Sequence, residues 1–245
     1  MRLLEAFRDN LDIPMEFARR ELDLTLAAIR PMEEQGKLSV KVSCEKRGLN
    51  HAKLPRPAGQ TVRLNEEQQA AVDRFCEDYE TGKRETYLIH GVTGSGKTEV
   101  YMELMARVLR DGKQVILLIP EISLTYQTVM RFYRRFGDQI AILNSRLSAG
   151  ERYDQWERAA RGEVSVMIGP RSALFAPFSN LGLILIDEEH EGSYKSENAP
   201  RYHAREAAIE RARMCGAYVV LGSATPSVDS YERSREGIYQ LYELP

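Results

Sequence analysis

The run Gly91-Val-Thr-Gly-Ser-Gly-Lys-Thr98 constrains this chain more than any other feature of its sequence. It fits the pattern G-x-x-x-x-G-K-[ST], whose backbone N–H groups wrap around nucleotide phosphates. An apolar segment (87–89) precedes the run and a helix-like segment (99–109) follows it, which is the context the motif requires. The sequence therefore predicts a nucleoside triphosphate site whose loop residues are Gly91, Thr93, Gly94, Ser95, Gly96, Lys97 and Thr98.

Apolar and amphipathic segments alternate from residue 64 to the end of the sequence. Strand-like segments occupy 86–90, 114–119, 139–143, 164–168, 183–186 and 218–221. Helix-like segments occupy 66–79, 98–109, 123–136, 149–161 and 204–214. Nearly continuous apolar strands that alternate with helices indicate a parallel sheet covered on both faces. We therefore predict an α/β fold, a P-loop parallel sheet flanked by helices, over residues 64–245.

The first 56 residues show a different pattern. Three helix-like segments (3–8, 14–21 and 24–35) are followed by a strand-like alternation at 38–42. This is the order of a winged helix, a helix-turn-helix variant that often docks on DNA, although many such modules bind proteins or act as spacers. We predict a small winged-helix domain over 1–56, with its DNA contact left open. Residues 57–63 are predicted to be a basic linker, which either follows phosphates or is simply solvated.

The composition limits the class of protein. Hydrophobic residues make up 43% and charged residues 29% of the 245 residues, as in ordinary globular domains. The longest apolar runs are strand-sized, far below the roughly 20 residues of a membrane helix, and no signal-peptide pattern follows Met1. The three cysteines are scattered and do not predict a zinc site by themselves. We expect a cytoplasmic protein without membrane contact.

An acidic motif follows the apolar segment 183–186. Its sequence is Asp-Glu-Glu-His, residues 187–190. An apolar strand that ends in adjacent carboxylates places them at the carboxyl edge of the sheet, where the phosphate loop also lies. We therefore predict that Lys97 contacts the β- and γ-phosphates, that Thr98 and Asp187 hold Mg²⁺, and that Glu188 polarises the attacking water.

Two further features fit a nucleotide-driven protein. Ser223 and Thr225 follow the last apolar strand and are suited to sensing the state of the nucleotide, and His190 is expected to form hydrogen bonds with them. Gln68 precedes the phosphate loop by one helix. Because a carboxamide can pair with N6 and N7 of adenine, Gln68 is a candidate contact for the base.

With these motifs in order, residues 64–245 resemble the first motor lobe of superfamily 2 helicases. The resemblance narrows to the PriA family (primosomal protein N′) of bacterial replication-restart helicases through segments 91–101, 120–125, 171–175, 187–191, 193–195, 201–205 and 222–226. It implies a RecA-like fold and an ATP-driven 3′→5′ DNA helicase that acts at stalled forks with ATP and Mg²⁺. It also implies forked or single-stranded DNA, primosome proteins and single-stranded DNA-binding protein as partners.

The resemblance implies a set of DNA contacts as well. Pro120, Glu121 and Arg171 match motifs that face the DNA strand. An aromatic-rich loop that links DNA contact to ATP turnover is matched by Tyr194, Lys195, Arg201 and Tyr202. Aromatic rings can stack on unpaired bases beside cations that bind phosphate. The alternative is that the two tyrosines only anchor the loop.

The chain also departs from the family pattern. Pro170 stands where the family usually has Thr or Ser, which removes a hydroxyl and an N–H. The second motor lobe with its zinc sites, and the N-terminal domain for the 3′ DNA end, are expected to lie outside this sequence. An arginine from the second lobe is worth roughly 10³–10⁵ in rate, so the chain is expected to bind ATP and hydrolyse it slowly by itself. The rival hypothesis is a winged-helix DNA-binding regulator with a nucleotide switch domain, which would favour paired half-sites.

Overall fold

The computed structural model describes residues 26–37 and 63–245. The chain divides into two units after Lys46. The described part of the first unit contains helix α3 (Leu26–Glu34), which lies within the predicted helix 24–35. The other segments of the predicted winged helix, and the predicted linker up to residue 62, lie outside the described residues.

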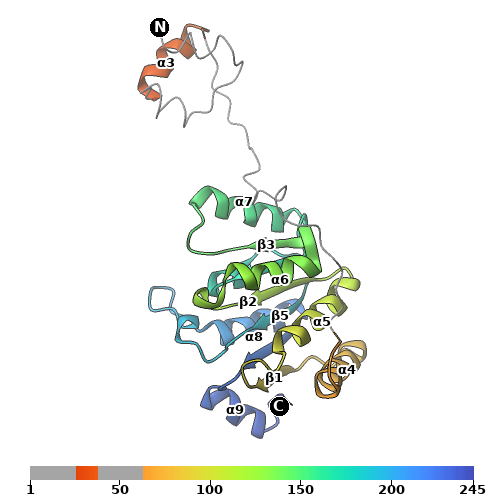
Figure 1. The fold of residues 1–245 in the computed structure, drawn as a ribbon. Coiled ribbons are helices and arrows are strands. Elements are labelled where there is room, and N and C mark those ends of the chain that lie inside the picture. Colours follow the sequence, from red (N-terminus) through yellow and green to blue (C-terminus); the bar gives the residue numbers. More distant parts are fainter. Residues whose placement is uncertain (1–25, 38–62) are drawn as a thin grey trace. The chain divides into compact units, whose positions relative to one another are not determined.

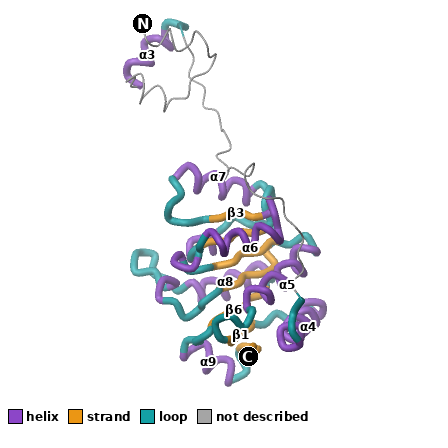
Figure 2. The backbone as a smooth tube through the Cα atoms, viewed as in Figure 1, coloured by secondary structure: helices purple, strands orange, loops and turns teal. Residues whose placement is uncertain are grey.

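The second unit is built on a seven-stranded parallel sheet in the order β3-β4-β2-β5-β6-β1-β7. The strands lie among the helices of this unit (Figure 2). The strands are β1 (Thr86–Gly91), β2 (Gln114–Leu118), β3 (Ile140–Ile142), β4 (Val166–Gly169), β5 (Leu181–Ile186), β6 (Tyr218–Ser223) and β7 (Tyr239–Leu244). The first six confirm the predicted strands to within a residue or two. Most of them are rich in aliphatic residues because both faces of a parallel sheet are covered.

Six helices follow or precede these strands. They are α4 (Glu66–Thr81), α5 (Lys97–Arg110), α6 (Tyr126–Phe136), α7 (Ala149–Ala160), α8 (Ala204–Cys215) and α9 (Val228–Arg235). Several begin after a capping residue whose side chain accepts a first-turn N–H, as Asn65 does for α4 and Ser148 for α7. The predicted helix 123–136 begins later, because residues 121–123 form a 3₁₀ turn, η2, and Thr125 caps α6.

Alternate side chains of the strands divide the core into two layers. Tyr87 and Ile89 of β1 face one layer with residues of α4, α5 and α6, whereas Leu88 faces the other layer. The second layer contains alanines of α7 and α8. The helices therefore cover both faces of the sheet, as predicted (Figure 1). Among the described residues, no helix combines the length and the apolarity needed to cross a bilayer.

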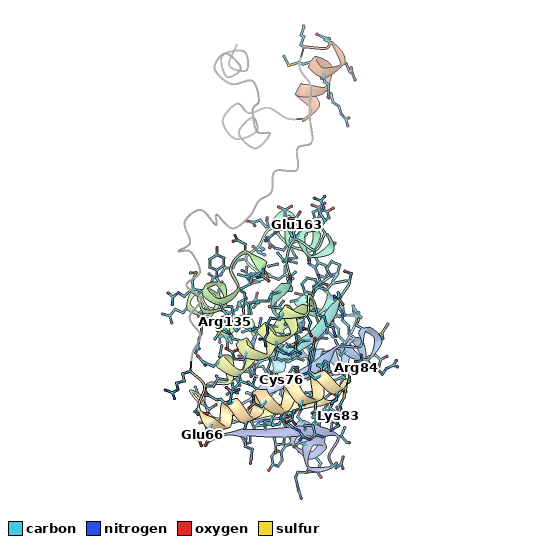
Figure 3. All side chains as sticks on the ribbon, turned by 90° about the vertical axis from the view of Figure 1, so that its right-hand side faces the viewer. Glu66, Cys76, Lys83, Arg84, Arg135 and Glu163 are labelled. Carbon is cyan, nitrogen blue, oxygen red and sulfur yellow. The ribbon has the colours of Figure 1, made fainter. Side chains whose placement is uncertain are left out.

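The sequence pattern did not predict α9 or β7. β7 pairs with β1 at the edge of the sheet, and its middle residues are only partly buried. An edge strand of this kind lacks the continuous apolar run that marks the central strands. Helix α4 contacts β7, and Figure 3 shows α4 with Glu66 at its start and Lys83 just beyond its end.

Candidate nucleotide-binding site

The phosphate loop connects β1 to α5 and closes around its own lysine. Lys97 is the first residue of α5, and its side chain is buried. Its Nζ donates hydrogen bonds to the carbonyl oxygen of Gly91, at 2.6 Å, and to that of Val92, at 3.4 Å. The ammonium group is thus held at the centre of the loop by backbone oxygens, which phosphate oxygens can replace.

Gln68 supports the loop from α4. Its Nε2 donates to the carbonyl oxygen of Ser95 at 2.8 Å, and its Oε1 accepts from the Asn65 N–H at 3.0 Å. Gly96 lies against this amide with a φ of +85°, and a Cβ at Gly96 would clash with Gln68 Nε2. The left-handed conformation therefore favours glycine there, and a Cβ would also require the Gln68 amide to shift. The amide braces the loop, and its contact with adenine stays a prediction.

The structure brings the predicted phosphate, metal and water-activating residues to one cleft of about 210 Å³. β5 ends at Ile186, so that Asp187 and Glu188 emerge at the carboxyl edge of the sheet beside the loop. The predicted residues that line the cleft are Thr93, Gly94, Gly96, Lys97, Thr98, Asp187 and Glu188, whereas the predicted residues Gly91, Ser95 and Gln68 do not line it. Two residues that were not predicted, Glu99 and Arg131, line it as well.

Two tyrosines fix the position of Asp187. The Tyr101 hydroxyl donates to Asp187 Oδ1 at 3.1 Å, and the Tyr194 hydroxyl donates to the Asp187 carbonyl oxygen at 2.6 Å. Burial, reinforced by the charge of Glu188, raises the pKa of Asp187 to about 6. The Tyr101 hydrogen bond and the Lys97 charge act in the opposite direction. A cation bound in the cleft would therefore favour the ionised carboxylate.

Glu188 has an unusual backbone conformation. Its φ is +48°, in the left-handed region that a residue with a Cβ seldom adopts. Glu189 follows it, and its N–H donates to the Gly222 carbonyl oxygen at the end of β6 at 3.0 Å. The sharp turn after β5 is thus tied to the neighbouring strand. Such local strain is typical of functional sites.

The side chain of Glu189 is the buried anchor of this turn, with 1% of the residue exposed. Its carboxylate accepts from the Ser227 N–H at 2.6 Å, from the Ser230 hydroxyl at 2.9 Å and from Arg205 Nη1 at 3.3 Å. These partners belong to α8, to α9 and to the cap of α9. The motif Asp-Glu-Glu-His did not reveal this role, because its partners are far away in the sequence.

His190 makes the hydrogen bonds that were expected of it. Its Nδ1 lies 2.7 Å from Ser223 Oγ, and its Nε2 lies 3.4 Å from Thr225 Oγ1. The Thr225 N–H also donates to Ser223 Oγ, at 3.0 Å. The acidic motif is therefore connected to the segment after β6. The coupling role of these three residues stays a prediction.

Two of the residues predicted to face DNA hold other loops in place, and a third is buried. Pro120 is buried at the end of β2. Glu121 Oε1 accepts from the Ser145 N–H at 2.5 Å, across to the segment after β3. The Arg171 guanidinium donates to the carbonyl oxygens of Ser193, at 3.0 Å, and Lys195, at 2.5 Å. Glu121 and Arg171 thus fix the positions of neighbouring surface loops, one of which carries the exposed Lys195.

The aromatic-rich segment separates into a buried and an exposed part. Tyr194 is 1% exposed and lies in the core, so the expectation that its ring stacks on a base is wrong for this conformation. Tyr202 is partly exposed and packs edge-on against Phe175, with ring centroids 5.3 Å apart. Lys195 and Arg201 are exposed. The cations, together with Tyr202, remain candidates for DNA contact.

The chain matches known proteins over most of its length. The family model described as Type III restriction enzyme, res subunit, matches residues 61–228. The replication restart protein PriA of Bacillus subtilis (strain 168) is 45% identical over 236 residues, which are 96% of this chain and 29% of the relative. That of Chlamydia pneumoniae is 47% identical over 182 residues, 74% of this chain and 24% of the relative. The chain thus spans less than a third of the length of these relatives.

A solved structure shows the same fold. RecG bound to a three-way DNA junction superposes with a TM-score of 0.55 at 22% identity, over 75% of this chain and 24% of that chain. The predicted RecA-like sheet and the resemblance to PriA are both confirmed. Because the family model matches well over half of the sequence, the chain belongs to the family described as Type III restriction enzyme, res subunit.

Proposed function

We propose that this chain provides the nucleotide-binding lobe of an ATP-dependent 3′→5′ DNA helicase that acts in replication restart. One observation carries the proposal: the phosphate loop, Thr98, Asp187 and Glu188 line a single cleft at the carboxyl edge of the sheet. The names of the relatives support the place in replication restart.

The residues of the cleft fit ATP and Mg²⁺. The Thr98 hydroxyl and the Asp187 carboxylate offer the oxygen ligands that Mg²⁺ prefers, and they would hold the ion beside the phosphates. When bound, Mg²⁺ neutralises charge that develops on the phosphates. Lys97 binds phosphate oxygens in place of its present carbonyl partners. Glu188 accepts a hydrogen bond from the attacking water and orients it.

We further propose that forked or single-stranded DNA lies over the ends of β2 and β4 and the loop that contains residues 192–203. Lys195 and Arg201 would contact phosphates, and Tyr202 would contact a base. The same loop carries Tyr194, whose hydroxyl bonds the Asp187 backbone. A shift of this loop when DNA binds would therefore also displace Asp187, the proposed metal ligand.

The relatives suggest the wider setting. We propose primosome proteins and single-stranded DNA-binding protein as partners, and the bacterial cytoplasm as the compartment, because the relatives are named as replication restart proteins. The rival hypothesis, a winged-helix regulator with a nucleotide switch domain, would require preference for particular DNA sequences.

Gel-shift titration with Mg²⁺ and the non-hydrolysable analogue AMP-PNP tests the proposal. A forked DNA should bind more tightly than a duplex of the same length, should do so for scrambled sequences, and should lose affinity steeply as salt rises. Tight binding to one duplex sequence, with no preference for forks, would favour the regulator.

A further inference from the structure

A second cation lines the nucleotide cleft from helix α6. Arg131 is part of the cleft wall together with Lys97 and Thr98, and its side chain is 48% exposed. It forms an ion pair with Glu99, which lies in the first turn of α5 and is only 12% exposed. The guanidinium group is thus held at the cleft, with part of its surface free for a ligand.

A matching ion pair lies one helical turn farther along both helices. Arg135 of α6 pairs with Glu103 of α5 at 2.6 Å, and its side chain is 16% exposed. Arg135 is labelled in Figure 3. Arg131 and Glu99 line the cleft, whereas Arg135 and Glu103 do not. The two pairs join the same helices, so Arg135 is a comparison for the part that Arg131 plays in holding α6 against α5.

The charges of the cleft indicate what Arg131 would bind. Lys97 and Arg131 are the cations among the described residues of its wall, and they face the acidic side chains of Glu99, Asp187 and Glu188. A nucleoside triphosphate adds several negative charges to this space. A guanidinium group presents a planar fork of donors that matches phosphate oxygens.

We infer that Arg131 is a nucleotide-binding residue that contacts the phosphates from α6, and that Glu99 positions it before the nucleotide arrives. The inference rests on the proposed nucleotide site and adds a residue that the motifs do not contain. Because α6 directly follows the segment 120–125, this contact also links the nucleotide to a segment proposed to lie beneath DNA.

Isothermal titration calorimetry with Mg²⁺ and AMP-PNP tests the inference on the wild type, Arg131→Gln and Arg135→Gln. Each variant loses one positive charge and one α5–α6 ion pair. Arg131→Gln should weaken binding about tenfold, whereas Arg135→Gln should stay within about twofold of the wild type. Equal affinities for the two variants would overturn the inference. Arg131→Lys keeps the charge without the fork and should lose only part of the affinity.

Tripolyphosphate separates phosphate contact from contact with the sugar or the base. Its affinity should fall in Arg131→Gln by the same factor as that of AMP-PNP, and an unchanged affinity would contradict a phosphate contact. Circular dichroism checks that each variant is folded. A wild type that binds no AMP-PNP would overturn the proposed function itself, whereas a binding wild type with an unaffected Arg131→Gln would overturn only this inference.

Discussion

Asp187 combines burial with a neighbouring negative charge, and this gives the nucleotide-free protein a pH dependence. Its pKa is raised from 3.8 to about 6. An acid whose pKa is raised by folding contributes stability that is fully present below its unfolded pKa and is lost as the pH rises through the folded value. The native state without ligand is therefore penalised at neutral pH.

Asp187→Asn should remove this penalty, because its side chain is neutral at every pH and can still accept from Tyr101. We expect the variant to be more stable than the wild type at pH 7.5 by about 1–3 kcal/mol, and the difference to disappear near pH 4. Urea unfolding at both pH values, with EDTA present, measures it. A difference that does not change with pH would rule out this explanation.

Gly222 shows how closely β6 approaches the site. A Cβ there would clash with the Tyr101 hydroxyl, which is bonded to Asp187. Gly222→Ala should therefore displace Tyr101 and cost about 1–3 kcal/mol of unfolding free energy. Gly192→Ala is the matched control, because no atom lies within 4 Å of its added Cβ. Similar urea midpoints for the two variants would contradict the packing described for Tyr101.

At the scale of the elements, Glu189 joins the end of β5 to α8 and α9. Glu189 forms a buried ion pair with Arg205. Arg205 also forms an exposed ion pair: its Nε donates to Glu206 Oε1 at 3.0 Å, and the Glu206 side chain is 47% exposed. One guanidinium group thus has one buried carboxylate partner, Glu189, and two exposed ones, Glu206 and Asp229. Breaking a buried ion pair leaves an uncompensated charge, whereas an exposed pair contributes little.

Glu189→Gln should therefore destabilise the protein by about 3–5 kcal/mol, and Glu206→Gln by less than about 1 kcal/mol. Chemical unfolding followed by circular dichroism measures both variants. If the two variants lose equal stability, Glu189 is not the buried anchor of the turn after β5.

The elements also show what the sequence could predict. The central strands and the phosphate loop are continuous patterns, so their positions followed from neighbouring residues. β7 could not be predicted because an edge strand keeps partly exposed polar positions. The contacts of Tyr101, Arg131 and Glu189 join segments that are distant in the sequence. The sequence could not place Tyr194, because an aromatic residue in a polar loop can point into the core as readily as toward DNA.

At the scale of the second unit, one edge of the sheet serves two proposed ligands. The nucleotide cleft lies at the ends of β1 and β5, and the proposed DNA surface lies at the ends of β2 and β4. β5 and β2 are neighbours in the sheet. The acidic motif therefore lies at the border between the nucleotide cleft and the proposed DNA surface. Helix α6 adds a second connection through Arg131.

The most direct test is calorimetric titration of the chain with Mg²⁺ and AMP-PNP, compared with Lys97→Ala and the control Lys83→Ala. Lys83 lies just beyond α4, outside the residues that line the cleft, and its loss removes the same charge. Saturable one-to-one binding that survives in Lys83→Ala and is lost in Lys97→Ala is the predicted result. Equal binding by Lys97→Ala and the wild type, or no binding by the wild type, would contradict the nucleotide site.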